Sequence, residues 1–246
     1  MARHFTRRNF FRLCASAAAL VGAHPHLLAN SAAPARRYER VRLVDTTGQP
    51  LKASQLTVGE NYLFHYPYIS TPSFLIDLGT SATAAASLQT ESGESYQGRG
   101  GVGPSNSIVA VSALCAHRMS HPARSVSFIN YRHQQVSFAN SKNDTVQRER
   151  VIYCCSEKSV YDPAQGARVL GGPAPQPLAA ILLDYDAAED SLFATGTNGG
   201  EMFERFFGEF AMRLSLEFNT TDIQTPVTKT AAVLPLAEYC KTQVLC

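Results

Sequence analysis

Several absences limit what this chain does. It lacks the apolar run of about 20 residues that a membrane-crossing helix requires, because the run from Leu13 to Ala23 has only eleven. It has no G-x-S-x-G, phosphate-binding loop, dinucleotide fingerprint or zinc-protease motif, so nothing indicates a stand-alone hydrolase or kinase. Acidic residues are missing from residues 1–35, and the remaining 211 residues carry 18 basic and 20 acidic groups, a net charge of −2. Since no basic face or tail follows residue 35, DNA and RNA are excluded as partners.

Residues 1–35 are typical of a twin-arginine export signal. Arg7 and Arg8 precede the apolar run, and a stretch of small residues continues to Ala35. Such a signal predicts a periplasmic protein, cleaved between Ala29 and Ala35, with no membrane span after cleavage. Because the pathway exports proteins that are already folded, often around a cofactor, it favours a cofactor-binding protein.

The remaining sequence predicts an all-β fold. At 45% hydrophobic and 17% charged residues, with 16 glycines and 13 prolines, the 246-residue chain has the composition of a folded protein. Short β-type runs alternate with turn residues. The predicted strands are Val41–Val44, Tyr62–Tyr66, Ser73–Leu78, Ile108–Ser112, Val126–Tyr131, Gln135–Phe138, Arg150–Tyr153 and Ile181–Tyr185.

Two further segments have their own character. Residues 79–101 are rich in Ser, Thr, Ala and Gly, which predicts an exposed loop without a core strand. After residue 200, apolar residues recur at three–four spacing, which predicts one amphipathic helix packed on its own domain. The residues concerned are Met202, Phe203, Phe206, Phe207, Phe210, Met212 and Leu214. We therefore assign residues 199–246 to a C-terminal extension with a short helical part.

The cysteines point to a site. Five follow residue 35, so at least one is unpaired, and Cys240 with Cys246 is a plausible small disulfide loop. The other three lie in two ordered boxes. The first is Cys115-Ala116-His117; after 36 residues comes the second, Cys154-Cys155-Ser156-Glu157-Lys158-Ser159-Val160-Tyr161-Asp162, and then the turn Gly172-Pro173-Ala174-Pro175.

This ordered set resembles a Rieske iron–sulfur site. In such a site two thiolates hold one iron of a [2Fe–2S] cluster and two imidazoles hold the other. The resemblance implies that Cys115 and Cys154 bind one iron and that His117 binds the other. It also implies that the Ser159 and Tyr161 side chains donate hydrogen bonds to the cluster and its ligand sulfur.

The resemblance extends to the fold. It implies a Rieske-type arrangement of small antiparallel sheets over residues 36–198, with a cluster-binding subdomain at about 113–178 and a covering loop that begins with Gly172 and Pro173. Three stretches that lead into Cys115 are similar to the small Rieske subunit of arsenite oxidase-type molybdoenzymes. They are Phe64–Pro67, Gly101–Pro104 and Ile108–Ser112.

The sequence departs from the family pattern where the second histidine ligand belongs, because Glu157 stands there. Three interpretations remain open. In the first, the Glu157 carboxylate ligates iron, which favours the ferric state and lowers the reduction potential relative to a two-histidine site. In the second, His121 or Cys155 supplies the fourth ligand. In the third, no cluster is bound and Cys115 forms a disulfide with Cys154 or Cys155. The two cysteines that commonly bridge the loops in this family are also absent, since Ser120 and Ser156 take their places.

Two functions follow from these interpretations. The first is a periplasmic Rieske-type electron-transfer protein, which acts as a subunit and not as a stand-alone catalyst. It passes electrons between a larger oxidoreductase and a periplasmic cytochrome or copper protein. The resemblance implies that the larger oxidoreductase depends on molybdopterin. The second is a Rieske-fold protein without a cluster that acts as a structural, export or interaction subunit. The state of the Cys115 and Cys154 thiols separates the two. His65 and His133 are expected to be structural or solvated.

Overall fold

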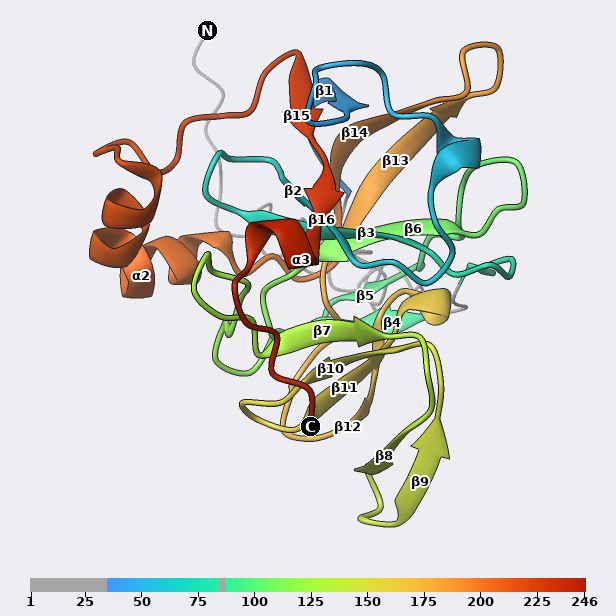
Figure 1. Ribbon diagram of the computed structural model, residues 1–246. Helices are drawn as coiled ribbons and strands as arrows, with labels where there is room; N and C mark the ends of the chain where they lie inside the picture. Colours follow the sequence, from blue (N-terminus) through green and yellow to red (C-terminus); the bar gives the residue numbers. More distant parts are fainter. Residues whose placement is uncertain (1–34, 85–86) are drawn as a thin grey trace, which may run out of the picture. The chain divides into compact units, whose positions relative to one another are not determined.

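The computed structural model describes residues 35–84 and 87–246, so the expected export signal lies outside the described residues except for Ala35. Within the described part the chain is mostly β, which confirms the all-β class, and its strands form one large and one small sheet with two hairpins beside them (Figure 1). No helix in these ranges is long and apolar enough to cross a membrane.

The large sheet has eight strands in the order β15-β1-β14-β13-β6-β3-β2-β16. Its strands are β1 (Arg36–Val44), β2 (Tyr62–His65), β3 (Pro72–Asp77), β6 (Ile108–Ser112), β13 (Ala180–Asp186), β14 (Ser191–Asn198), β15 (Thr230–Ala232) and β16 (Leu234–Pro235). Leu63, Phe74 and Ile76 on β2 and β3 are fully buried on the side of the small sheet, and their neighbours Phe64 and Leu75 are fully buried in the opposite core. A sheet buried on both faces needs continuous apolar strands, and β3 and β6 provide them.

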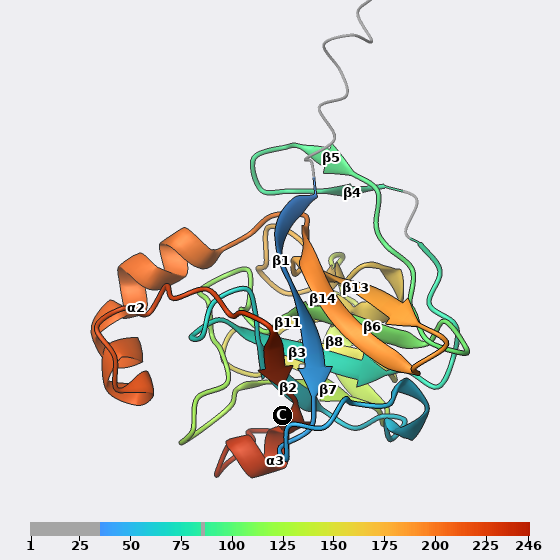
Figure 2. The same ribbon diagram turned by 90° about the horizontal axis from the view of Figure 1, so that it is seen from above.

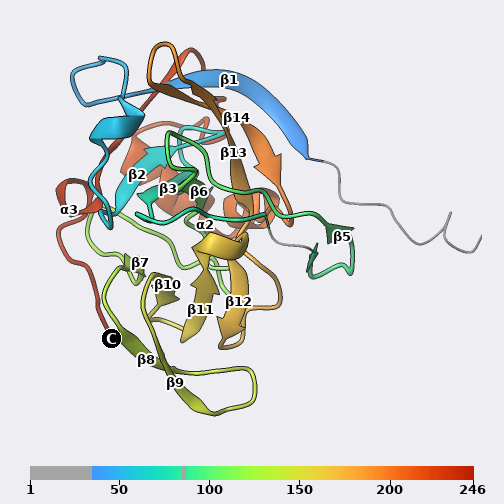
Figure 3. The same ribbon diagram turned by 90° about the vertical axis from the view of Figure 1, so that its right-hand side faces the viewer.

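The small sheet carries the second box and has the order β12-β11-β10-β7. It lies below the large sheet in Figures 1 and 3. Its strands are β7 (Ile129–Arg132), β10 (Val151–Cys154), β11 (Ser159–Asp162) and β12 (Arg168–Gly171), with the short helix η3 (Pro163–Gln165) between the last two. The hairpin of β8 (Val136–Ala139) and β9 (Thr145–Arg148) extends from it.

The predicted helix forms as α2 (Phe203–Phe218), which ends four residues beyond Leu214, the last residue of the predicted pattern. It lies to one side of the sheets in Figures 1 and 2. Its buried residues Phe203, Phe206, Phe207 and Leu214 share a core cluster with Leu114 and Met119 beside the first box. The helix therefore packs on its own domain, as expected. Met212 is a correction: it is 82% exposed and not part of the buried face.

All eight predicted strands form, and several others were missed. In the loop expected between residues 79 and 101, β4 (Leu88–Gln89) and β5 (Ser95–Tyr96) make a separate two-stranded hairpin. In the C-terminal segment, β15 pairs with β1 in parallel and β16 pairs with β2 in antiparallel. The short helices η2 (Ala53–Gln55) and α3 (Leu236–Tyr239) complete the elements. The domain boundaries at residues 36, 198 and 199 stay predictions.

Candidate functional site

The first box lies on the loop that leaves β6. Two backbone hydrogen bonds close this loop on itself, from Met119 N to Cys115 O at 2.7 Å and from Cys115 N to Ser120 O at 2.9 Å. Met119 is fully buried under α2 and has a positive φ of 52°. The loop is thus anchored by its own backbone and by the α2 cluster, which fixes the direction of Cys115 and His117.

The second box is the hairpin between β10 and β11. Cys154 ends β10 directly opposite Ser159, the first residue of β11, and a four-residue turn that includes Glu157 joins them. The covering loop packs tightly on this turn at Gly172. A Cβ added at Gly172 would lie 2.3 Å from Lys158 O, and its φ of 83° also favours glycine. Pro173, the next residue, is exposed.

Cys115 and Cys154 form the inner half of the site. Both are fully buried, share one core cluster and are free thiols. The Tyr161 hydroxyl lies 3.3 Å from Cys115 Sγ and accepts a hydrogen bond from Ala116 N at 3.1 Å. The hydrogen bond between the two cysteines lowers the pKa of Cys115 to about 6, with a smaller contribution from Tyr161, although burial opposes it.

The same cysteine pairing raises the pKa of Cys154, and burial adds to this effect. The two shifts have opposite directions, so the pair favours a state with one thiolate and one protonated thiol. Because the thiolate is the form that binds a metal, a bound cation would have to displace the proton of Cys154.

His117 and Glu157 form the outer half. Their side chains are each 27% exposed, and His117 Nδ1 lies 3.5 Å from Glu157 Oε2. This pair does not make a hydrogen bond, so His117 Nδ1 is buried without a partner in the described part of the chain. Two donors on one tetrahedral ion with bonds of about 2.0–2.1 Å lie about 3.4 Å apart. The observed separation matches that spacing.

The four donors therefore form two pairs. Within residues 35–84 and 87–246 no three His, Cys, Asp or Glu side chains converge as they would around a single ion. Two donors for each of two irons is the arrangement that a [2Fe–2S] cluster requires. Ser159 Oγ is also buried without a partner among these residues, and a buried hydroxyl without a partner is costly. These two atoms, among several buried polar atoms without a partner in the described residues, belong to residues that the sequence assigned to the cluster, so the side chains present fit the group.

The prediction of a disulfide between Cys240 and Cys246 was wrong. Cys246 pairs instead with Cys155, across a sequence separation of 91 residues and a Cα–Cα distance of 5.6 Å, and Cys240 is a free thiol. The bridge leaves Cys155 with no thiolate to offer as a fourth ligand. Cys115 is a free thiol, so it does not form the disulfide with Cys154 or Cys155 that was expected of a site without a cluster.

The other proposed fourth ligand, His121, lies against α2. Its ring packs edge-on against Phe206 and Phe210, at centroid distances of 4.8 and 4.9 Å. Its Nδ1 is 2.8 Å from Met119 O. His121 is therefore part of the support of the first box. His65 is likewise structural, with its ring 5.2 Å from Phe218 and 5.6 Å from Tyr239.

Sequence analysis missed the segment that supports the second box from outside. Residues 242–246 run beside the start of β7, where Val244 N donates to Ser127 O at 2.8 Å and Ser127 N donates to Thr242 O at 2.9 Å. Asn130 Nδ2 adds a hydrogen bond to Val244 O at 2.9 Å. These hydrogen bonds hold the C-terminal segment in the position where Cys246 forms its disulfide with Cys155. The odd number of cysteines was a signal that some pairing had to be long-range or absent.

A buried carboxylate holds the end of β11. Asp162 is fully buried, and Arg148 Nη2 donates to its Oδ2 at 2.5 Å while Arg168 Nε lies 3.7 Å from the same oxygen. A buried charge is tolerated only when it is paired in this way. Arg148 on β9 and Arg168 on β12 therefore attach the β8–β9 hairpin and β12 to the strand that carries Ser159 and Tyr161.

The chain is similar to the soluble domain of the Rieske protein II from Sulfolobus acidocaldarius, with 25% sequence identity and a TM-score of 0.43, over 65% of this chain and 79% of that chain. No family model matches the chain.

Proposed function

We propose that this chain is a Rieske-type electron-transfer protein that holds a [2Fe–2S] cluster between its two boxes. In this proposal Cys115 and Cys154 hold the inner iron, and His117 and Glu157 hold the outer one. The observation that carries the proposal is the pairing of the donors: two free buried thiols on one side, and a nitrogen and an oxygen 3.5 Å apart on the other. A cluster of this type, when bound, accepts and releases one electron.

The chain's own residues adjust the energetics of that site. The Tyr161 hydroxyl is placed to donate to the Cys115 sulfur while it accepts from Ala116 N, which orients the first box. Hydrogen bonds to ligand sulfur stabilise the reduced state. The Glu157 carboxylate brings a negative charge where the family has a neutral imidazole, and an anionic oxygen ligand stabilises the ferric state. The proposed site therefore has a lower potential than a two-histidine site.

The proposed partners and location rest on the sequence. The twin-arginine pattern of residues 1–35 supports export to the periplasm. Resemblance to the small subunit of arsenite oxidase-type enzymes supports a larger, molybdopterin-dependent oxidoreductase as one partner and a periplasmic cytochrome or copper protein as the other. The partial exposure of His117 and Glu157 supports electron exchange at this edge of the site, since it brings the outer pair to the surface.

The deciding experiment is the measurement of iron and acid-labile sulfide in protein exported through its own signal, together with an EPR spectrum after reduction with dithionite. We expect two irons and two sulfides per chain and a [2Fe–2S] signal. Protein that is folded but free of iron, even after anaerobic reconstitution, would contradict the proposal and favour the cluster-free interaction subunit.

Replacing the divergent ligand tests its assignment. Glu157→His should raise the reduction potential toward the range of about −150 to +300 mV that two-histidine sites occupy, as measured by redox titration of the EPR signal. Glu209→His is the matched control, because Glu209 is exposed on α2 and pairs with Arg205 at 3.2 Å. A potential that does not change in Glu157→His would remove Glu157 from the ligand set.

A further inference from the structure

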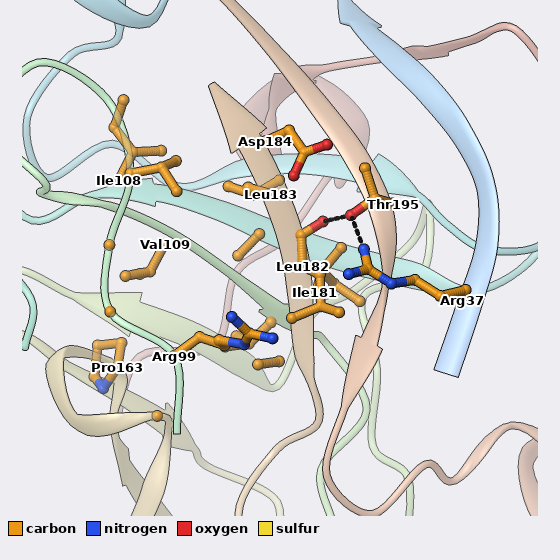
Figure 4. Close-up of a pocket in the computed structure, with 17 residues that line it drawn as sticks. Arg37, Arg99, Ile108, Val109, Pro163, Ile181, Leu182, Leu183, Asp184 and Thr195 are labelled. Atoms are coloured by element: carbon orange, nitrogen blue, oxygen red, sulfur yellow. Dashed lines mark hydrogen bonds between the residues drawn. The ribbon is translucent and has the colours of Figure 1, made fainter. Parts of the chain in front are cut away.

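The large sheet opens between two of its strands. Each of these two strands pairs fully with its outer neighbour: β6 pairs with β3 at five positions, and β13 pairs with β14 at seven. Between them β6 and β13 share a single register pair, Val111 with Ala180. A cavity of about 250 Å³ lies where these two strands separate (Figure 4).

Most of the side chains that line this cavity are apolar, and the backbone of its strands and loops adds polar atoms. The two strands contribute the buried side chains of Ile108, Val109, Ile181 and Leu182. Pro163 of η3, the short helix between β11 and β12 of the small sheet, also lines the cavity, so residues from both sheets border it. Pockets for drug-sized ligands are usually about 300–1,000 Å³. This one suits a smaller body, such as a single ring or a short aliphatic chain.

Two arginines reach the cavity from opposite sides. Arg37 comes from β1 across β14, and Arg99 comes from the loop before β6; both extend toward the same stretch of β13 (Figure 4). Arg37 Nη1 donates to Thr195 Oγ1 at 3.4 Å, and this hydroxyl donates to Leu182 O at 3.3 Å. Guanidinium groups are planar donors suited to carboxylates.

Neither arginine has an acidic partner. In the part of the chain that the structure describes, neither forms an ion pair, and the one acid that lines the cavity, Asp184, lies 3.6 Å from Arg40 instead. The remaining residues, 1–34 and 85–86, contain no Asp or Glu that could serve. Two positive charges therefore border the cavity, and the carboxylate of Asp184, which also lines it, is paired with Arg40 and not with either of them.

We propose that the cavity between β6 and β13 binds a small organic monocarboxylate. Its apolar body occupies the gap between the strands, and its carboxylate meets the guanidinium groups of Arg37 and Arg99. The apolar walls favour such an anion over an inorganic one, because burial of its body adds a hydrophobic contribution. The two charges favour it over a neutral molecule of the same shape.

The proposal is tested by titrating the isotopically labelled protein with benzoate and following its backbone amides by NMR. Benzyl alcohol, which keeps the ring and lacks the charge, and sodium sulfate, which keeps the charge and lacks the ring, are the two matched probes. Benzoate should give saturable shifts at residues 99–102, 108–111 and 180–184, and should bind at least about tenfold more tightly than either control probe.

Variants assign the charge. Arg37→Gln and Arg99→Gln should each weaken benzoate binding about tenfold, while Lys142→Gln, in the exposed turn between β8 and β9, should leave it unchanged. Both arginine side chains are exposed, so the variants should fold normally. Equal binding of benzoate and benzyl alcohol, equal binding of benzoate and sulfate, or shifts that do not saturate at the named residues would each overturn the proposal.

Discussion

The two halves of the candidate site differ in how they are built. The cysteine half is fully buried in a core cluster that both sheets share, whereas the side chains of His117 and Glu157 are each 27% exposed and both residues lie in turns. This difference explains where the sequence departs from the family pattern. An added carboxylate in the buried half would have to be desolvated at a cost of several kcal/mol, while in the exposed half water still solvates it. In the proposed site, the exposed half is therefore the one that can accept a carboxylate in place of an imidazole.

The largest effect is expected from a substitution in the buried cysteine half of the site. Cys154→Ser removes one of the two thiols, so the protein should lose all cluster iron and its EPR signal. The matched control is Cys240→Ser, which replaces another free buried cysteine whose Sγ lies 3.0 Å from Thr242 O. Iron analysis of both variants checks this. A full iron content in Cys154→Ser would contradict the assignment of the inner pair.

The next effect concerns the bridge that supports the second box. Cys155→Ser opens a disulfide that closes 91 residues, and chain-entropy arguments give such a loop about 4–5 kcal/mol of stability. Cys246→Ser should cost the same, because both remove one bridge. Denaturant unfolding measures the difference in free energy of unfolding. In strong reductant, the unchanged protein and the two variants should have nearly equal free energies of unfolding. A difference that persists in reductant would mean that the bridge does not form.

A smaller effect tests the link between the boxes. Tyr161→Phe leaves Ala116 N without its acceptor, which should cost about 1–3 kcal/mol of unfolding free energy. It also removes the donor to Cys115 Sγ, so the potential of the loaded protein should fall. Tyr153→Phe is the control, because the described residues offer its hydroxyl no hydrogen bond. Equal potentials in the two variants would show that Tyr161 does not reach the cluster.

The effect expected to be smallest near neutral pH lies outside the site, at a buried histidine of the core. Burial, aided by the charge of Arg124, lowers the pKa of His65 to about 4. Between about pH 6.5 and pH 4 the unfolded chain therefore binds a proton that the folded chain does not, and folding weakens as the pH falls by about 1 kcal/mol per pH unit. His65→Gln should flatten this part of the stability curve. Parallel curves for the two proteins would show that His65 protonates normally.

The sequence predicted much of the fold because the clearest strands carry apolar and β-branched residues, as in Ile108–Ser112. It missed β14 (Ser191–Asn198), which contains Thr, Gly and Asn and forms because β1 and β13 lie on both sides of it. The two boxes named four candidate donors, but the division of these side chains into two pairs depends on loop directions that α2 and Gly172 impose. The disulfide prediction failed because nearness in sequence favoured Cys240, whereas the fold brings Cys246 to Cys155.

Cys154 and Cys155 are neighbours in sequence with separate chemical fates. The first ends a strand and turns its sulfur into the core beside Cys115; the second begins the turn and carries its sulfur outward to Cys246. Because successive side chains at a strand end point to opposite faces, the register of β10 separates the free thiol of Cys154, a proposed iron ligand, from the oxidised sulfur of Cys155. A slip of one residue in β10 would exchange the two, so the pairing of β10 with β7 and β11 also protects the protein from thiol–disulfide scrambling.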